Sequence, residues 1–400
     1  MMKSGPLLLA ASWLLPSSTT FTALSSRPRV GRLFSGASSS SDVTAAALRS
    51  GISRLSTLQT LLKKFGAPGS ECTEANDLSP VVAFEDTPEL VGCLIGNDAE
   101  LMNLHPHLFP ISKSEKTGNY ICALRRAYAD DASYESSTDA PWPIVEARSG
   151  GPGMRLLALS SEHLMRRIAC ESDFAGFQKD IIAIYNDGLG RGLVNDKELD
   201  VVYEPGSPEL LGYGVDKYIL LRVAPFPDLY ERMATQHAAR GDEQSALIAA
   251  EACNRKLPGF GSTFKFQAKL LSSFPKREEE ARDVARMCLR MPLPSIGMTQ
   301  EVFHEVAVLA QLADENDSND EAMAKLRDMY EKIRQHGQEE NPAVQQGMTP
   351  EQAAFEEANY LLDTVALTGG KWSDIRMQLG EIYRSVGRED MSDFVNPKVL

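Results

Sequence analysis

The sequence predicts a mainly α-helical protein, in which tetratricopeptide-like stacked helical hairpins fill the C-terminal half and a smaller mixed α/β region precedes them. Two observations support this fold class. From residue 227 onward, amphipathic segments of about a dozen residues alternate with short turns that contain Gly or Pro. Upstream, short apolar runs alternate with Gly-rich and Pro-rich loops, which is typical of strands mixed with helices.

The chain begins with a segment whose composition differs from that of the rest. Residues 1–41 contain four basic residues and no Asp or Glu, whereas residues 42–400 contain 37 basic and 55 acidic residues, a net charge of −18. An apolar run over residues 7–15 is followed by a stretch rich in Ser, Thr and Arg over residues 17–41, with Phe21 behind small polar residues. Import sequences avoid acidic residues, so this composition predicts a processed leader.

We expect residues 1–41 to be a bipartite plastid-targeting leader and the stroma of the chloroplast to be the destination. The arrangement resembles the leaders of algae with secondary plastids, such as diatoms, in which a signal peptide precedes a transit peptide that opens on an aromatic residue. A plain secretory signal and a mitochondrial presequence are the alternatives. The rest of the chain divides into a mixed α/β region, residues 42–224, and a helical-hairpin domain, residues 225–400.

The composition of the mature part excludes several classes of partner. No run after the leader approaches the roughly 18 consecutive apolar residues that span a bilayer, so we expect a soluble chain without a transmembrane segment. The negative charge repels phosphate backbones, which makes nucleic acid an unsuitable partner and favours basic protein surfaces. The six cysteines have neither C-x-x-C nor zinc spacing, which predicts buried or free thiols, with a regulatory disulfide as the alternative. They are Cys72, Cys93, Cys122, Cys170, Cys253 and Cys288.

In the mixed region, residues 43–65 carry apolar side chains at helical spacing and end at Gly66, which predicts a helix at the edge of the folded body. Apolar runs rich in β-branched and aromatic residues predict strands at residues 120–128, 154–159 and 218–223. Two helical stretches lie between the loops of this region.

The helical half contains an internal repeat. Turns are expected at residues 241–242, 258–259, 275–276 and 292–297, and the helix after the first turn overlays the helix after the third at an offset of 35 residues. Small side chains coincide in the overlay and allow paired helices to approach closely. Ala246, Ala250 and Cys253 coincide with Ala281, Ala285 and Cys288.

Further helices are expected at residues 298–313, 321–336 and 350–367, and a final hairpin at residues 372–394 around Gly387. Thr349-Pro350-Glu351-Gln352 is a capping box that fixes the start of the third of these helices. Polar composition predicts loops at residues 314–321 and 338–347.

A charged cluster over residues 161–173 is expected on a helix, where Glu162 can pair with Arg166 and His163 can neighbour Arg167. In a functional interpretation, His163, Arg166 and Arg167 bind carboxylates or a phosphate of a partner. In the structural alternative, the cluster is a solvated helix face held by ion pairs.

An aromatic, Pro-rich segment over residues 212–230 joins the two halves. Prolines flank Phe226, and the segment can present Tyr213, Lys217 and Phe226 to a partner. A seam between domains that packs its aromatic side chains inside explains the same residues.

No motif predicts a catalytic residue, a cofactor or a metal. The glycine clusters match neither nucleotide-loop pattern, and residues 314–325 lack the Gly and Glu of a calcium loop. His105 and His107 have no acidic or thiol partner at useful spacing, and no nucleophile elbow is present. We therefore expect a protein that is not an enzyme, although residues distant in sequence can still assemble a site.

Residues 161–174, 212–230, 258–271 and 372–394, together with the leader, resemble a plastid family shared by green plants and diatoms, the soluble assembly factors for the catalytic head of the chloroplast ATP synthase. The resemblance implies a stromal, non-enzymatic chaperone that binds the nucleotide-binding β subunit before or during its assembly with α. A helical-repeat scaffold for another thylakoid complex and an unrecognised stromal enzyme are the alternatives.

Overall fold

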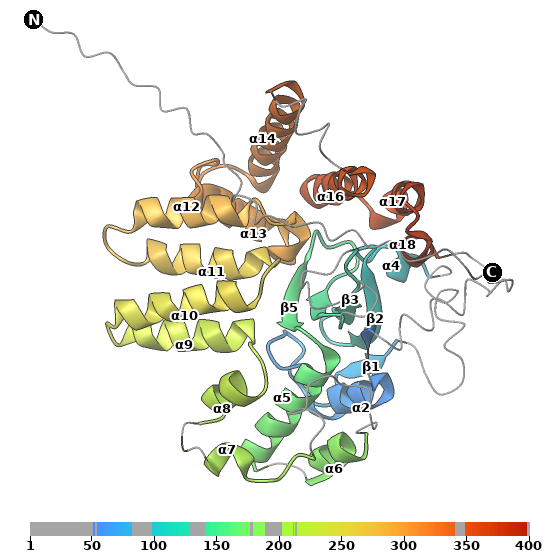
Figure 1. Cartoon of the computed structure of the whole chain (residues 1–400). Coiled ribbons are helices and arrows are strands. Elements are labelled where there is room, and N and C mark those ends of the chain that lie inside the picture. Colours follow the sequence, from blue (N-terminus) through green and yellow to red (C-terminus); the bar gives the residue numbers. More distant parts are fainter. Residues whose placement is uncertain are drawn as a thin grey trace, which may run out of the picture. The chain divides into compact units, whose positions relative to one another are not determined.

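Helices dominate the chain and the strands lie in its N-terminal half, as the sequence predicts (Figure 1). The leader, residues 1–41, lies outside the part described, and Ser38–Leu400 form one compact unit. The computed structural model describes residues 51–52, 54–81, 98–127, 141–176, 179–188, 202–210, 212, 214–340 and 349–397.

The sheet is an antiparallel meander in the order β1-β2-β3-β4-β5. The strands predicted at residues 120–128 and 154–159 are confirmed as β3 and β5, each shorter than expected, and three further strands were not anticipated. The strands are β1 Leu78–Pro80, β2 Leu108–Ser114, β3 Tyr120–Leu124, β4 Ile144–Ala147 and β5 Met154–Ala158.

Side chains on both faces of the central strand β3 are buried, which is why its sequence is apolar without alternation. The pairing of β2 with β3 shifts register between Pro110 and Ser112. A shift there suits Pro110, which has no N–H to donate to a regular ladder. The carbonyl of Ile111, inside the shift, accepts hydrogen bonds from Val81 N (3.1 Å) and Gln59 Nε2 (3.0 Å).

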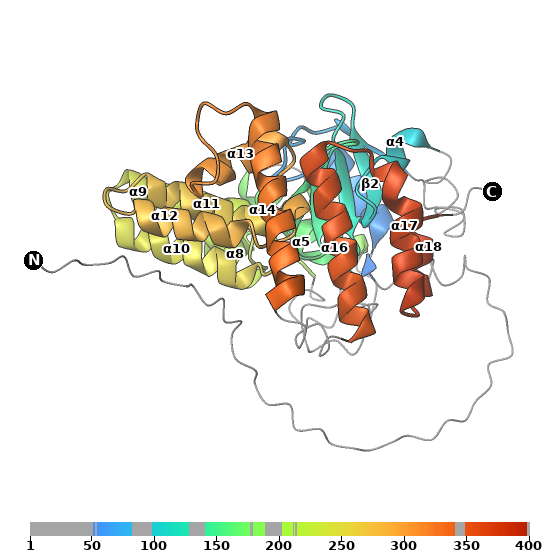
Figure 2. The ribbon, with the colours of Figure 1, turned by 90° about the horizontal axis from the view of Figure 1, so that it is seen from above.

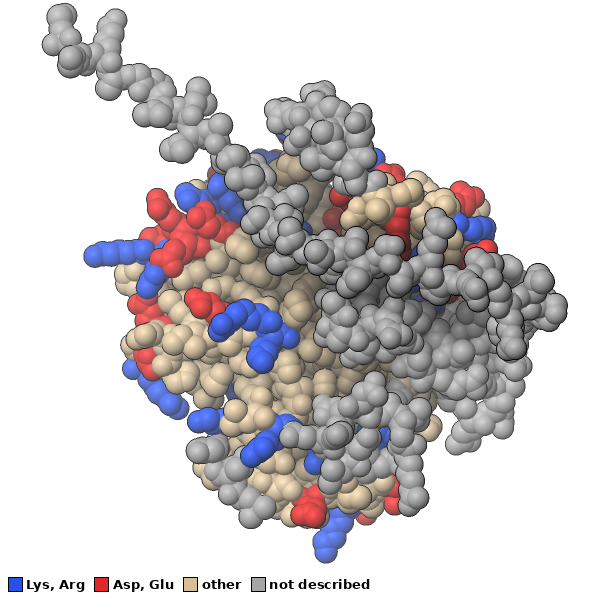
Figure 3. Space-filling view, viewed as in Figure 1, with Lys and Arg blue, Asp and Glu red and all other residues tan. Residues whose placement is uncertain are grey.

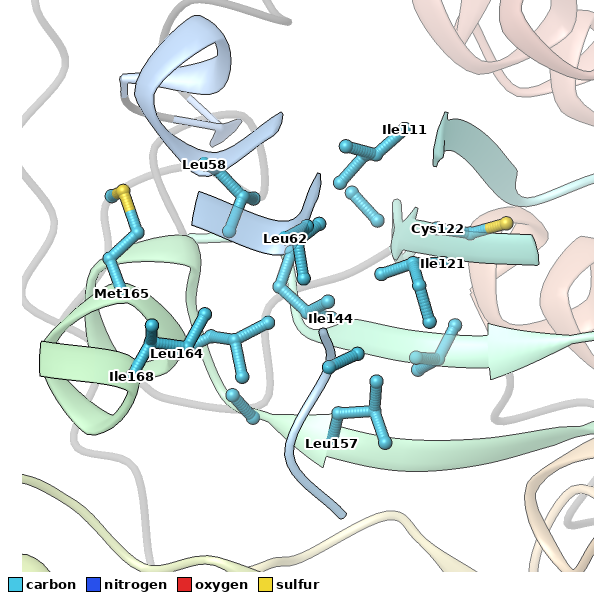
Figure 4. Packing of buried hydrophobic residues seen from close by; sticks show 14 of the residues in the cluster. Leu58, Leu62, Ile111, Ile121, Cys122, Ile144, Leu157, Leu164, Met165 and Ile168 are labelled. Carbon is cyan, nitrogen blue, oxygen red and sulfur yellow. The ribbon is translucent and has the colours of Figure 1, made fainter. Parts of the chain in front are cut away.

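Helices α2, Leu55–Phe65, and α5, Ser161–Phe174, pack on one face of the sheet (Figure 4). Leu58 and Leu62 of α2 and Leu164 of α5 are fully buried there. The helix expected over residues 43–65 is therefore confirmed as α2 in its second half, but it belongs to the core rather than to an edge. Residues 43–50 lie outside the described part of the chain.

The strand predicted at residues 218–223 is wrong, because this segment forms helix α8, Val215–Arg222. A short apolar run does not by periodicity alone distinguish a buried strand from a helix. Gly214 starts the helix with φ at 83°, and only Ile219 is buried in the core. The other short helices here are α4 Ala99–Met102, α6 Lys179–Asp187 and α7 Ser207–Leu210.

Four helices follow as two stacked hairpins, and they lie one above another beside β5 in Figure 1. The predicted turns are confirmed: Gly241, Gly259 and Lys276 have φ between 65° and 81°, where glycine is favoured and Lys276 is an exception. The helices are α9 Pro227–Ala239, α10 Glu243–Lys256, α11 Gly261–Ser272 and α12 Glu278–Cys288.

The 35-residue repeat is confirmed by burial. All six small residues of the overlay are at most 2% exposed, so each supplies a contact between helices. Helix α9 packs on α10, α10 on α11 and α11 on α12. The stack is therefore held by contacts between neighbours in the sequence, as in other helical repeats.

The C-terminal segments fold back toward the sheet. In Figure 2, α14, α16 and the α17–α18 hairpin lie side by side, and contacts join α14 to α16 and α16 to α17. The capping box at Thr349 and Gln352 is confirmed. Helix α14 covers residues 319–321 of the first expected loop and 338–340 of the second, so both loops are shorter than predicted, and residues 341–347 lie outside the described part. The elements are η2 Leu293–Ser295, α13 Gln300–Leu309, α14 Asn319–Glu340, α16 Pro350–Thr368, α17 Trp372–Ser385 and α18 Glu389–Val395.

Candidate functional site

Helix α5 carries the charged cluster, as predicted, and its start is fixed by Ser160, whose hydroxyl accepts a hydrogen bond from His163 N (3.2 Å). Leu164 and Ile168 of α5 face the sheet, and other parts of the helix contact α6, α7 and α8. This geometry gives the two consecutive arginines of the cluster different surroundings.

Arg167 is 1% exposed and joins α5 to α9. Its two terminal nitrogens donate to the carboxylate of Asp228, both at 2.6 Å, and its Nε donates to Glu171 (2.7 Å). Burial alone would lower the pKa of Arg167, but the hydrogen bonds and charges of Asp228 and Glu171 raise it above its ordinary value. Arg167 therefore forms the ion pairs that the structural alternative predicted. They lie inside the protein and not on a solvated helix face.

Phe226 is also internal. It is fully buried, and the Arg167 guanidinium lies 4.8 Å from the centre of its ring. Pro227 follows as the first residue of α9. The segment thus packs its aromatic side chain inside, in agreement with the seam interpretation. We assign Arg167 and Phe226 structural roles and leave them out of the contact surface proposed below.

Arg166 occupies the more accessible side of α5. It is half-buried, and its guanidinium stacks on the rings of Tyr203 (4.7 Å) and Tyr185 (5.5 Å). Tyr203 donates its hydroxyl hydrogen to Asp173 (2.7 Å), which holds the segment before α7 against the end of α5. His163 is half-buried on the same helix.

Exposed apolar side chains occur on α5, on α8, which contacts α5, and next to Tyr203. Phe174 (48% exposed) follows Asp173, Val202 (58%) precedes Tyr203, and Leu221 (60%) lies one turn from the exposed Lys217 on α8. Three of the seven large apolar side chains that are most exposed in the described part are in this region. We define Arg166, Phe174, Val202, Lys217 and Leu221 as the α5–α8 surface; Tyr213 lies outside the described residues, and its partner contact stays a prediction.

A second cluster, which the sequence did not indicate, joins the C-terminal hairpin to the sheet region. Arg376 of α17 is 2% exposed and donates hydrogen bonds of 2.8 Å each to the carbonyls of Met102, Leu104 and Val395. Burial lowers the pKa of Arg376 to about 10, which leaves it charged at neutral pH. Its position on the apolar stripe of α17, four residues after Trp372, is the signal that could have revealed its burial.

The two histidines before β2 belong to this cluster. Both are buried, and a hydrogen bond of 2.8 Å joins His107 Nε2 to the hydroxyl of Tyr383. Burial, with the charges of Arg125 and Arg376, lowers the pKa of His107 to about 3, so its ring is neutral. Arg125 donates to Asp390 of α18 (2.7 Å). These contacts bind the C-terminal hairpin to the sheet region.

Within the described residues, no group of three or more His, Cys, Asp or Glu side chains is placed to hold a metal ion. The five cysteines described there are buried and free, as predicted, and Cys93 lies outside. None of the helices in the part that the structure describes is long and apolar enough to cross a membrane. On the face in Figure 3, basic and acidic side chains lie close together over the helical stack.

Two stacked helical hairpins that pack through their neighbours in the sequence define a helical-repeat protein. Residues 227–313 match the family model described as the PAB middle domain, and residues 326–398 match the PAB C-terminal domain. The chain is 31% identical over 295 residues to Protein IN CHLOROPLAST ATPASE BIOGENESIS, chloroplastic, of Arabidopsis thaliana, covering 73% of this chain and 78% of the relative. The chain belongs to the family of this Arabidopsis protein. No solved structure matches.

The comparison confirms two predictions. The resemblance to plastid assembly factors is confirmed at the level of the family, and the plastid destination agrees with the chloroplastic location of the relative. The matched region of the middle domain begins at Pro227, the first residue of α9.

Proposed function

We propose that the protein is a non-enzymatic stromal assembly factor that binds the β subunit of the chloroplast ATP synthase before or during its assembly with α. The observation that carries the proposal is membership of a family whose Arabidopsis member is named for chloroplast ATPase biogenesis. A factor of this kind needs a surface that recognises an unassembled subunit and releases the assembled one.

We place this contact at the α5–α8 surface. Protein interfaces combine apolar and aromatic side chains at their centre with arginine, and they are poor in acidic residues. Phe174, Val202 and Leu221 supply exposed apolar area, while Arg166 and Lys217 supply the cations. The stacking of Arg166 on Tyr203 and Tyr185 holds its guanidinium in place before binding, which lowers the entropy lost on association.

The acidic part of the chain offers a second, separate surface. Residues 314–400 contain 18 acidic and 9 basic residues, whereas residues 227–313 contain 11 of each. A partner attracted mainly by negative charge would therefore bind the C-terminal helices, and its association would weaken as salt increases. A contact through the α5–α8 surface depends less on salt, because burial of apolar area supplies most of its free energy.

A pull-down from chloroplast stroma with the chain lacking residues 1–41 tests both the partner and the surface. We compare wild type with Leu221→Asp and with the matched control Met377→Asp, which changes an apolar residue that is 67% exposed on α17. We expect free β subunit, with or without α, to be enriched over the complete synthase. Leu221→Asp should reduce this enrichment at least about tenfold, a loss near 1.4 kcal/mol, and the control should retain it.

Each other outcome is informative. Recovery of a different thylakoid complex would favour a scaffold and overturn the proposed partner. Enrichment of β that falls with Met377→Asp rather than with Leu221→Asp would keep the partner and move the contact to the acidic C-terminal helices.

A further inference from the structure

A cavity of about 220 Å³ lies where the sheet region, the α10–α11 turn, η2 and helices α16 and α17 meet. Its walls are mostly apolar and include Met154, Phe260 and Leu362. A dry apolar cavity of about 150 Å³ is enough to bind benzene, so this one has room for one or two fused rings. It is smaller than the roughly 300 to 1,000 Å³ of pockets that hold drug-sized ligands, which excludes a whole nucleotide.

Helix α16 supplies the polar edge of the cavity. Phe355, Asn359 and Asp363 all line it and are spaced four residues apart, which places them on one face of the helix. One oxygen of Asp363 accepts a hydrogen bond from Leu293 N (2.8 Å). In the described part of the chain, the Asn359 amide and the second oxygen of Asp363 have no hydrogen-bond partner, and Asn359 is half-buried.

Aromatic side chains form part of the lining, and two of them are neighbours whose ring planes are tilted by 57°. The rings of Phe355 and Tyr383 lie 6.4 Å apart between centroids, and both line the cavity. Tyr383 is held by its hydrogen bond to His107, so this wall is fixed before any ligand enters. Arg126 lies 4.9 Å from the centre of the Phe260 ring and is the cation of the lining.

We propose that this cavity binds a small planar nitrogen heteroaromatic molecule that carries an exocyclic amino group, of the size of a nucleobase. The aromatic rings of the lining offer stacking and edge-to-face contacts to such a ring. The Asn359 amide can donate to a ring nitrogen and accept from an N–H, while the free oxygen of Asp363 accepts from the amino group. The proposal is independent of the partner suggested above, because the cavity is separate from the α5–α8 surface.

The electrostatics of Asp363 agree with this geometry. Burial raises its pKa to about 7, since few groups compensate its charge, and the hydrogen bond from Leu293 only partly opposes the shift. A ligand amino group would supply a donor to the second oxygen of Asp363. Ligand binding should therefore stabilise the ionised carboxylate.

Isothermal titration calorimetry of the chain lacking residues 1–41 with adenine and with hypoxanthine tests the proposal. The titrations are run at pH 8, where the Asp363 carboxyl is ionised. The two bases have the same size, but hypoxanthine replaces the amino group of adenine by a carbonyl, which the carboxylate of Asp363 repels. We expect saturable binding of adenine at least about tenfold tighter than that of hypoxanthine, since an unpaired polar contact costs about 1 to 3 kcal/mol.

Two variants separate recognition from folding. Asp363→Asn keeps the acceptor for Leu293 N and turns a donor toward the ligand, so the preference should reverse toward hypoxanthine, an effect that a merely structural role would not produce. Asn359→Leu should weaken adenine binding at least about tenfold, whereas Asn316→Leu in an exposed loop should not. Unfolding midpoints check that each variant is folded. Absence of saturable adenine binding to the wild type, or an unchanged base preference in Asp363→Asn, would overturn the proposal.

Discussion

The helical stack α9–α12 and the junction of the C-terminal hairpin with the sheet region are stabilised in different ways. In the stack, small residues such as Ala250 and Ala285 let neighbouring helices approach, and most contacts join helices that follow one another in the sequence. At the junction, Arg376 and Tyr383 bond to groups more than 270 residues earlier. The contacts within the stack are mainly apolar and join segments close in sequence. The contacts at the junction are polar and join segments far apart in sequence.

This difference has an energetic consequence. An apolar contact weakens in proportion to the area it loses, whereas a buried cation that loses its partners leaves several carbonyl groups unsatisfied. Single substitutions at the junction should therefore cost more than single substitutions in the stack. Single substitutions, ordered from the largest expected loss of unfolding free energy to the smallest, test this ranking.

Replacing Arg376 by Met should lower the free energy of unfolding by about 3 to 5 kcal/mol, because three backbone carbonyls lose a charged donor in a buried site. Urea denaturation measures the change. Arg384→Met is the matched control on the same helix, where the side chain is exposed, and it should cost less than about 1 kcal/mol. Equal costs for the two variants would contradict a special role of the junction.

Arg167→Met should cost about 2 to 4 kcal/mol, because Asp228 and Glu171 would keep their charges without the buried guanidinium between them. Arg166→Met, at the next position, should cost about 1 kcal/mol through lost stacking on Tyr203. Thermal or urea unfolding of both variants checks the difference. A larger loss for Arg166 would reverse the structural and surface roles assigned here.

In the stack, Ala285→Leu should cost about 1 to 3 kcal/mol, because the added atoms enter a fully buried contact between helices. Ala239→Leu places the same change at an exposed position of α9 and should be nearly neutral, since Ala and Leu have similar helix propensity. Unfolding midpoints in urea distinguish the two. A neutral Ala285→Leu would show that the repeat packs more loosely than the structure indicates.

The smallest effect concerns pH. The pKa of Asp363 is raised from an ordinary 3.8 to about 7 in the folded state, so between these values the folded protein holds a proton that the unfolded chain has released. Stability then falls as pH rises through this window. Asp363 is half-buried and lines the cavity, so solvent screens its charge and the effect on stability is far smaller than the pKa shift alone implies. Asp363→Asn should remove this fall and exceed the wild type by about 1 kcal/mol at pH 8, with no difference near pH 4, as unfolding in urea at both pH values would show. A variant with the same pH profile as wild type would contradict the burial of this carboxyl.

The sequence revealed the local features of this fold. Alanine spacing and turn residues identified the stack, and Thr349 identified the start of α16, because these signals act within a few residues. The α8 segment was misread as a strand because its apolar run has no clear period. The junction escaped detection because its contacts join residues far apart in sequence, and the type of residue alone does not specify such pairs.

The residues predicted to contact a partner fall into an accessible group and a buried group. Arg166 is half-buried and Lys217 is exposed, while Arg167 and Phe226 turn inward, although the sequence gives no reason to distinguish one arginine from the next. The rotation of α5 about its own axis, relative to the sheet, decides which of the two arginines is buried. That rotation depends on Leu164 and Ile168 packing on strands whose position the sequence did not fix.

The central claim is that the protein recognises an unassembled subunit rather than a finished complex. Equilibrium binding of the purified chain lacking residues 1–41 to isolated β subunit and to the complete catalytic head of the chloroplast ATP synthase tests it most directly. We predict saturable binding to isolated β and binding to the complete head that is at least about tenfold weaker, a difference near 1.4 kcal/mol. No binding to isolated β, or equal affinity for both, would contradict the account.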